Sequence, residues 1–242
     1  MIPSVESLPV STLRERAVVI ENTLIVSDLH LGRTSYDELQ IPTPEYDEIL
    51  SRMQDLLHDI RPETVVFAGD VFQQFDHPPD EAIETLEKLR QMIVEDFGAE
   101  LVITPGNHDT YKFDINSIFD GRIEEEYQIP NTSVTVYHGH TKPQTSSELF
   151  IVGHLHPALE HRGSRWPCFL YGQNVYDGAD ILVLPAFSEV IRGVPVRSYT
   201  PPVNLSIPIV ENGDWLSEYY PIVYDTATEE TRIFPKVGKI DQ

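Results

Sequence analysis

The sequence predicts an α/β fold in which two mixed β-sheets pack face to face and helices flank the pair of sheets. Three observations support this. Aliphatic strands alternate with amphipathic helices in the first half of the chain, and short strands and turns dominate after about Gly121. In addition, 242 residues with 40% hydrophobic content suffice for one sizeable core. We expect a single domain over residues 1–242, because no linker, repeat or low-complexity segment divides the chain.

Four strands are expected before Gly121. Residues 17–20 and 23–26 should form a hairpin around Glu21-Asn22, and residues 64–68 and 101–104 are later aliphatic runs of strand length. One helix is expected between the strands at 23–26 and 64–68, and a second between those at 64–68 and 101–104. One should begin at Thr43-Pro44 and end before Pro62, and the other should begin near Asp80 and end at Gly98. Because helices lie between them, the strands at 23–26, 64–68 and 101–104 should run parallel.

Helical periodicity is weak after Gly121, where the chain has the pattern of short strands joined by turns. The expected strands are residues 134–137, 150–152, 169–171, 181–184, 207–210 and 219–224. They predict a second sheet with more antiparallel pairs than the first. Residues 193–242 carry many prolines and should supply strands and loops that complete this second sheet.

The composition argues against several classes of protein. No apolar stretch approaches the roughly 20 residues that cross a bilayer, so we expect no membrane span. The first residues lack the basic start and the apolar block of a secretion signal. Cys168 is the only cysteine, which leaves no internal disulfide and no thiolate zinc site. The expected compartment is therefore the cytoplasm.

The chain is strongly acidic. Asp and Glu number 39 against 17 Lys and Arg, which gives a net charge of −22, and only five of the basic residues are lysines. Self-repulsion of this size destabilises a compact state in dilute buffer, whereas in molar salt the screening length falls to about 3 Å and the penalty largely disappears. The charge therefore predicts a halophile protein. An acidic, well-solvated surface without salt adaptation is the simpler alternative.

Five short motifs place metal-binding side chains directly after aliphatic runs. They are SDLHLG with Asp28 and His30, AGDV with Asp70, PGNHD with Asn107 and His108, YHGH with His138, and VGHLH with His154 and His156. If the strands lie side by side in one sheet, all eight side chains meet at one edge, where open α/β sheets place their sites. So many polar groups should converge only around divalent metal, and two ions suit their number better than one.

The motifs differ in how specific they are. Asp-x-His and Gly-Asp are common without any ligand, whereas Gly106 and Asn107 combine a close backbone approach with a neutral oxygen ligand. Two histidines one residue apart, His154 and His156, rarely serve packing. In this order, each after a strand, the series DLH, GD, GNHD, HG and GHLH resembles the calcineurin-like metallophosphoesterase superfamily. Four further segments, HLGR, HGHTKP, GHLHPALE and LPAF with IRG, resemble more narrowly the archaeal small phosphoesterases related to the bacterial ligase-associated DNA-damage-response endonuclease.

The resemblance implies a four-layer αββα sandwich and a defined set of site residues. Asp28, His30 and His156 would hold one metal ion, Asn107, His138 and His154 would hold a second, and Asp70 would bridge them. His108 would be the catalytic residue, which stabilises the transition state or protonates the leaving oxygen, as an imidazole can near neutral pH. Imidazoles mixed with carboxylates suit manganese, iron, cobalt or zinc, and we expect manganese chiefly from the resemblance.

Several neighbouring residues keep two interpretations. Asp109 either orients His108 or caps its loop, and His140 is either a donor near the second metal or, more simply, a surface histidine. Arg33 either holds a phosphate oxygen or forms a surface ion pair. Other arginines that could cluster near the site are Arg162, Arg165, Arg192 and Arg197.

The sequence therefore predicts a two-metal phosphoester hydrolase, and most directly a phosphodiesterase or nuclease that uses a metal-activated water. A small-nucleotide or cyclic-nucleotide phosphodiesterase is the alternative, because the chain offers little of the basic surface on which nucleic-acid binding rests. A non-catalytic scaffold is the third hypothesis, although no ligand of the family pattern is missing. The expected partner is a phosphodiester such as DNA or a nucleotide. No association with a membrane is expected. A homo-oligomer stays open, and a DNA-repair helicase is implied by the resemblance alone.

Overall fold

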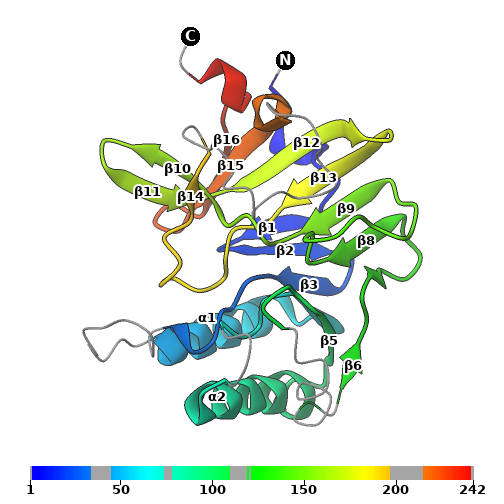
Figure 1. The fold of residues 1–242 in the computed structure, drawn as a ribbon, viewed down its shortest axis with the longest axis vertical. Helices are drawn as coiled ribbons and strands as arrows, with labels where there is room; N and C mark the ends of the chain where they lie inside the picture. The colour runs from blue at the N-terminus through cyan, green and yellow to red at the C-terminus, as the bar shows by residue number, and fades with distance from the viewer. Residues whose placement is uncertain are drawn as a thin grey trace.

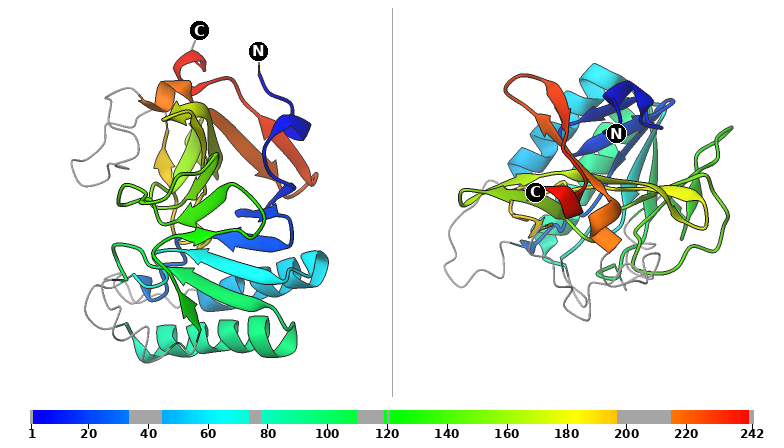
Figure 2. Two further views of the ribbon diagram at one scale, coloured as in Figure 1. Left: turned by 90° about the vertical axis from the view of Figure 1, so that its right-hand side faces the viewer. Right: turned by 90° about the horizontal axis from the view of Figure 1, so that it is seen from above.

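Two mixed β-sheets pack against each other, and two α-helices cover the outer face of one of them (Figure 1). The structure is a computed structural model that describes residues 2–33, 45–73, 78–109, 119, 121–196 and 215–240. Seen from a second direction, the two helices again lie together on one side of the molecule (Figure 2). The mixed α/β class with two sheets is confirmed.

The six-stranded sheet has the order β1-β2-β3-β4-β5-β6. Its strands are β1 (Thr12–Arg14), β2 (Ala17–Ile20), β3 (Thr23–Val26), β4 (Thr64–Ala68), β5 (Glu100–Thr104) and β6 (Arg122–Ile123). β2 and β3 form the predicted antiparallel hairpin, and β3, β4 and β5 pair parallel, as their alternation with helices predicts. Because these three strands are parallel, their carboxyl ends lie at the same edge of the sheet.

The helices pack on the outer face of this sheet. In α1 (Glu45–Ile60), Ile49, Met53 and Leu57 are buried and share a core with the outward side chains of β3, β4 and β5. Burial of this stripe stabilises the helix by roughly 1.5–3 kcal/mol for each large side chain. Thr43 and Pro44, the predicted start of the helix, lie outside the described residues.

The second helix, α2 (Asp80–Arg90), continues into a π-helical turn, η3 (Gln91–Asp96). The chain leaves the turn at Gly98, whose φ of +73° is the left-handed conformation that explains the predicted glycine stop. In the described part of the chain, no helix is long and apolar enough to span a membrane.

The second sheet has seven strands in the order β16-β15-β12-β13-β9-β8-β7. They are β7 (Tyr127–Gln128), β8 (Val134–Tyr137), β9 (Leu149–Val152), β12 (Phe169–Tyr176), β13 (Ala179–Val183), β15 (Tyr220–Asp225) and β16 (Glu230–Ile233). β8, β9 and β13 pair parallel and the other pairs are antiparallel, so this sheet is the more antiparallel one, as predicted. The predicted strand at 207–210 lies outside the described residues.

The core between the two sheets is apolar on both sides. Ile25, Val66 and Val102 of the first sheet belong to the same buried cluster as Ile151 and Leu182 of the second. This continuous interior holds the two sheets at a fixed spacing, which matters because both sheets contribute residues to one site.

A small third sheet and several short helices complete the fold. The sheet consists of β10 (Pro157–His161), β11 (Ser164–Pro167) and β14 (Val194–Pro195), and the 3-10 helices are η1 (Val5–Ser7), η4 (Trp215–Glu218) and η5 (Val237–Lys239). Among the described residues, α-helices lie only against the six-stranded sheet. The second helical layer of the expected four-layer sandwich is therefore not seen there, and the outer face of the seven-stranded sheet packs against β10, η4 and η5 instead.

Candidate metal centre

The five motifs lie where the two sheets meet, and the expectation that their strands share one sheet is wrong. Asp28, Asp70 and Asn107 follow β3, β4 and β5 of the six-stranded sheet, whereas His138 and His154 follow β8 and β9 of the seven-stranded sheet. Direct hydrogen bonds join the two edges. The backbone N–H of His154 lies 3.2 and 3.1 Å from the two carboxylate oxygens of Asp28, and the Nδ1 of His138 donates to the carbonyl of Ala68 at 3.2 Å.

The backbone turns sharply at most of the motif residues. Asp28, His30, Asp70, His154 and His156 have φ between +45° and +70°, the left-handed region in which non-glycine residues are uncommon but Asp and His are enriched. A left-handed residue breaks the in-and-out alternation of a strand, which lets closely spaced side chains turn toward one point. Two of these turns support each other, because the N–H groups of Asp28 and His30 donate to the carbonyls of Gly69 and Asp70 at 3.0 and 2.9 Å.

A glycine accompanies three of the motifs because a side chain there would collide with a site residue. A Cβ on Gly69 would lie 2.2 Å from His138 Nδ1, and a Cβ on Gly153 would lie 2.5 Å from Asp28 Oδ2. At Gly106 it would lie 2.1 Å from Asp70 Oδ1. The close backbone approach predicted for Gly106 is thus present, and Gly69 and Gly153 share it.

The first cluster of donor atoms consists of Asp28, His30, Asp70 and His156. His156 Nε2 lies 3.1 Å from Asp28 Oδ1 and 3.1 Å from His30 Nε2, and His30 Nε2 lies 3.8 Å from Asp70 Oδ2. Asp28, His30 and Asp70 are buried, and His156 is half-buried. The donors come from β3, β4 and β9, so this cluster spans both sheets.

The second cluster consists of Asp70, His138 and His154, with Asn107 beside them. His138 Nε2 lies 3.3 Å from Asp70 Oδ2, 3.1 Å from His154 Nδ1 and 3.0 Å from Asn107 Oδ1. The bond from His138 Nδ1 to a backbone carbonyl leaves Nε2 to face these donors, which is how metal-binding histidines are usually oriented. Asp70 belongs to both clusters.

The charges in the site also favour a cation. Burial and the neighbouring His156 lower the pKa of His30 to about 3, and burial and His138 lower the pKa of His154 to about 3, so both imidazoles are neutral and can offer a lone pair. Burial would lower the pKa of His138 too, but Asp70 and Asp28 outweigh it and raise that pKa to about 9. Burial likewise opposes ionisation of Asp70, but His138 and His30 hold its pKa well below the usual range.

This donor set fits a pair of divalent cations. In each cluster the candidate ligand atoms lie within 4.8 Å of one another, and the two clusters share one carboxylate. Two buried carboxylates need compensating positive charge, since burial of an unpaired charge is costly. Imidazole nitrogens mixed with carboxylate oxygens are ligands for transition-metal ions and zinc more than for calcium.

His108 lies beside the clusters without belonging to either. Its Nε2 is 4.0 Å from Asp70 Oδ2, and its backbone N–H donates to Asp70 Oδ1 at 2.9 Å. Its Nδ1 donates to the carbonyl of Gln73 at 2.7 Å, so the ring presents Nε2 toward the site. Arg33 donates to the side chain of the same Gln73 at 2.9 Å, which places this arginine near His108 but gives it no ion pair among the described residues.

Two residues with open interpretations are now placed. The carboxylate of Asp109 accepts the backbone N–H groups of Val71, Phe72 and Gly106, so it caps the loop rather than orienting His108 directly. Burial and the nearby Asp70 raise the pKa of Asp109 to about 6. His140 is half-buried with its ring 5.2 Å from that of His138, so the simpler expectation of a surface histidine is wrong.

Two arginines outside the five motifs hold a loop beside the site. Arg16 donates to the carbonyls of Ala186 and Ser188 at 2.8 and 3.0 Å, and Arg52 donates to the carbonyl of Phe187 at 2.7 Å. The N–H of Phe187 in turn donates to the carbonyl of Ser27, the residue before Asp28, at 2.8 Å. These contacts join residues more than a hundred positions apart, so no local pattern could reveal them. Of the other arginines considered, Arg197 lies outside the described residues.

Comparison with known proteins gives one family and a shared fold. The family model described as calcineurin-like phosphoesterase matches residues 22–177. The structure of nuclease MPE from Pseudomonas putida has 21% identity and a TM-score of 0.60, over 86% of this chain and 88% of that chain, which supports a common fold. The phosphoesterase Yfce from E. coli has 13% identity and a TM-score of 0.42, over 88% of this chain and 98% of that chain, too weak a likeness to carry an argument. No curated protein matches this chain.

Proposed function

This chain belongs to the calcineurin-like phosphoesterase family, and we propose that it is a two-metal phosphodiesterase that cleaves nucleic-acid strands. That it is a metallophosphoesterase follows from the family and from the intact His and Asp clusters. The observation that carries the finer proposal is the sharing of Asp70 by two donor clusters, because one carboxylate between two sites can serve a pair of ions.

Each ligand has a role in this proposal. Asp28, His30 and His156 would hold one ion, Asn107, His138 and His154 would hold the other, and Asp70 would contribute to both. Paired ions would supply Lewis acidity to phosphoryl oxygens and a water that deprotonates near neutral pH. We assign manganese, since this mixture of nitrogen and oxygen donors suits it and the sequence resemblance points the same way.

His108 supplies the proton that the leaving oxygen needs. Its Nδ1 is occupied by the Gln73 carbonyl, and Nε2 faces the shared carboxylate at 4.0 Å. A protonated imidazole in this orientation can donate from Nε2 to an alkoxide as the P–O bond breaks, a contribution that is typically worth 10²–10⁴-fold in rate. Because its backbone N–H also bonds to Asp70, the ring is positioned relative to the clusters.

Cleavage of nucleic acid is favoured over hydrolysis of a small nucleotide by two further considerations. The structure named as a nuclease, from Pseudomonas putida, shares this fold over most of its length. Arg33 donates to the side chain of Gln73, whose carbonyl accepts from His108, and its guanidinium can also contact a phosphate oxygen. The narrower resemblance to archaeal phosphoesterases adds a role in DNA repair, beside a helicase, to the proposal. A net charge of −22 agrees with a salt-rich cytoplasm, in which repulsion between an acidic protein and DNA is screened.

The test is hydrolysis of bis-p-nitrophenyl phosphate with manganese in molar KCl. We expect turnover that a chelator abolishes and added Mn²⁺ restores. A parallel series with single-stranded DNA, duplex DNA, RNA and cyclic dinucleotides distinguishes a nuclease from a nucleotide phosphodiesterase. No turnover of the artificial diester with manganese, iron, cobalt or zinc would overturn the proposal in favour of a scaffold, and turnover of cyclic dinucleotides alone would overturn the nuclease assignment.

A further inference from the structure

A cavity of about 470 Å³ is lined by three arginines, Arg16, Arg165 and Arg192, and by two glutamates, Glu160 and Glu189. The arginines come from the turn between β1 and β2, from β11 and from the segment before β14. They are a quarter of the arginines of the chain, which has 17 basic residues in all and 39 acidic ones.

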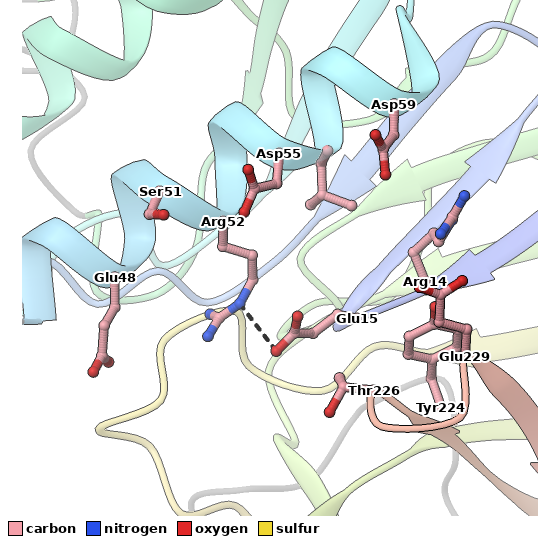
Figure 3. Close-up of a pocket in the computed structure, with 11 residues that line it drawn as sticks. Arg14, Glu15, Glu48, Ser51, Arg52, Asp55, Asp59, Tyr224, Thr226 and Glu229 are labelled. Atoms are coloured by element: carbon pink, nitrogen blue, oxygen red, sulfur yellow. Dashed lines mark ion pairs between the residues drawn. The ribbon is translucent and has the colours of Figure 1, made fainter.

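The positive lining is not a general feature of this protein's surface. A second cavity, of about 380 Å³, lies between α1 and the turn that joins β15 and β16 (Figure 3). Its lining includes five carboxylates, those of Glu15, Glu48, Asp55, Asp59 and Glu229, against two arginines, and one of these, Arg52, is paired with Glu15 at 3.4 Å. The arginine-lined cavity therefore differs in charge from this second cavity.

The arginines of this cavity have N–H groups that are not used in the hydrogen bonds of the described residues. In the described part of the chain, Arg192 is exposed and makes no ion pair or hydrogen bond. Arg16 uses one nitrogen, Nη1, for its two carbonyl partners. Arg165 pairs with Glu160 at 3.0 Å, but its side chain is 41% exposed, so that contact is weak and can be exchanged. The exposed guanidinium of Arg192 is therefore available to an anionic ligand.

The cavity lies next to a metal-centre residue. The N–H of Val194 donates to the carbonyl of His156 at 2.7 Å, and Arg165 Nη1 donates to the carbonyl of Gly193 at 3.2 Å. A Cβ on Gly193 would lie 2.9 Å from the His156 carbonyl, so the residue that follows Arg192 packs closely against the backbone of His156. An anion held by Arg165 and Arg192 would thus lie beside the backbone segment that carries His156.

We propose that this cavity binds the phosphate that neighbours the scissile phosphodiester on a nucleic-acid strand. The inference rests on the proposed function and adds a second anion subsite to it. Planar guanidinium groups bind phosphate through two parallel N–H bonds, and such contacts to the backbone set the register of a strand without reading its sequence. The subsite favours substrates with at least two phosphates over simple diesters.

The test compares KM of Arg192→Gln and of the native enzyme for the dinucleotide TpT and for its phosphorylated forms pTpT and TpTp. The native enzyme should have a KM about tenfold lower for one phosphorylated form than for TpT, as expected for a hydrogen bond to a charged group. Arg192→Gln should lose that preference while its kcat on bis-p-nitrophenyl phosphate stays native. For longer single strands, the slope of log KM against log salt concentration should fall by about 0.7.

Arg61→Gln is the matched control, because this exposed arginine follows α1 and precedes β4 at the opposite edge of the sheet. It removes the same charge and should leave the phosphate preference intact. A second readout is binding of a labelled thymidine tetranucleotide to chelator-treated protein, in which Arg192→Gln should raise Kd about tenfold. The subsite proposal is overturned if Arg192→Gln keeps the preference for the phosphorylated dinucleotide, or if Arg61→Gln loses that preference equally. In either case, hydrolysis of the artificial diester would still support the proposed function. If neither the native enzyme nor either variant hydrolyses that diester, the proposed function itself is overturned.

Discussion

Replacement of Gly106 by alanine should displace the shared carboxylate without removing any proposed ligand. The added Cβ would lie 2.1 Å from Asp70 Oδ1 and 2.4 Å from the Asp70 backbone nitrogen. Ordinary contact begins at 3.4 Å, so Asp70 Oδ1 and residue 106 must separate by the difference, 1.3 Å. Since Gly106 itself does not have a left-handed φ, this collision is the main source of strain.

The displacement cannot be absorbed easily. Asp70 is buried, and it is held by the N–H of His30 on its carbonyl and by the N–H of His108 on its carboxylate. Overpacking of this kind costs about 1–3 kcal/mol, which lowers Tm by about 2–4 °C for each kcal/mol in a chain of this size. A shift of about 1 Å in a catalytic group can cost 10²-fold in rate, so kcat/KM should fall at least about 100-fold.

The assay combines metal content after dialysis, kcat/KM on bis-p-nitrophenyl phosphate and a thermal melt. Gly98→Ala is the control: nothing lies within 4 Å of its Cβ, but its φ of +73° strains the substituted backbone. This control should lose about 1 kcal/mol of stability and keep native metal content and turnover. If Gly106→Ala retains two metal ions and native kcat/KM, the glycine is not required by the approach of Asp70 and the reasoning fails.

Four other outcomes are expected. His108→Ala should keep its metal content and lose about 10²–10⁴-fold in kcat on the artificial diester, and native turnover would contradict its role as an acid. Asp70→Asn should weaken metal binding itself, since both clusters lose a charged donor. Calorimetric titration with Mn²⁺ measures the affinity, and an unchanged affinity would contradict the sharing of Asp70 by the two clusters. Arg52→Ala should lower the free energy of unfolding by about 1–3 kcal/mol in urea titrations, because the Phe187 carbonyl and Glu189 lose a buried partner, whereas Arg232→Ala, in an exposed pair, should cost less than about 1 kcal/mol. Tm should rise between about 0.1 and 1 M KCl as the charge of −22 is screened. A Tm that does not change with KCl concentration would refute salt adaptation.

Local sequence pattern predicts the elements of this fold better than their assembly. The runs at 64–68 and 134–137 are similar in length and apolar character, yet β4 and β8 belong to different sheets. What decides membership is pairing over long distances, such as that of β9 with β13 some thirty residues later. β12 extends from Phe169 to Tyr176, well past the apolar run, because its exposed end pairs with β13 across a bulge. Hydrophobic periodicity predicts neither the sheet to which a strand belongs nor the extra length of β12.

The candidate site divides in the same way. The residues could be chosen from the sequence because metal ligands form short motifs with glycine beside them, as at Gly106 and Asn107. Their orientation could not, since it depends on distant groups. The Ala68 carbonyl that directs His138 lies seventy positions away, and the loop that Arg16 holds lies 170 or more positions away. The surface placement expected for His140 failed for this reason, because its ring packs beside a cluster built by other motifs.

The left-handed conformation of so many site residues indicates how the chain keeps this centre assembled. Each such residue carries strain on the order of 1–3 kcal/mol, and Asp28, His30, Asp70, His154 and His156 all carry it. Strain of that size persists only where the surroundings fix the backbone. Here the carbonyls of residues 69 to 71 accept the N–H groups of Asp28, His30 and Leu31, and the Asp28 carboxylate accepts the N–H of His154 from the other sheet. The donors are thus positioned by backbone hydrogen bonds across both sheets, so that metal would bind to ligands already turned toward it.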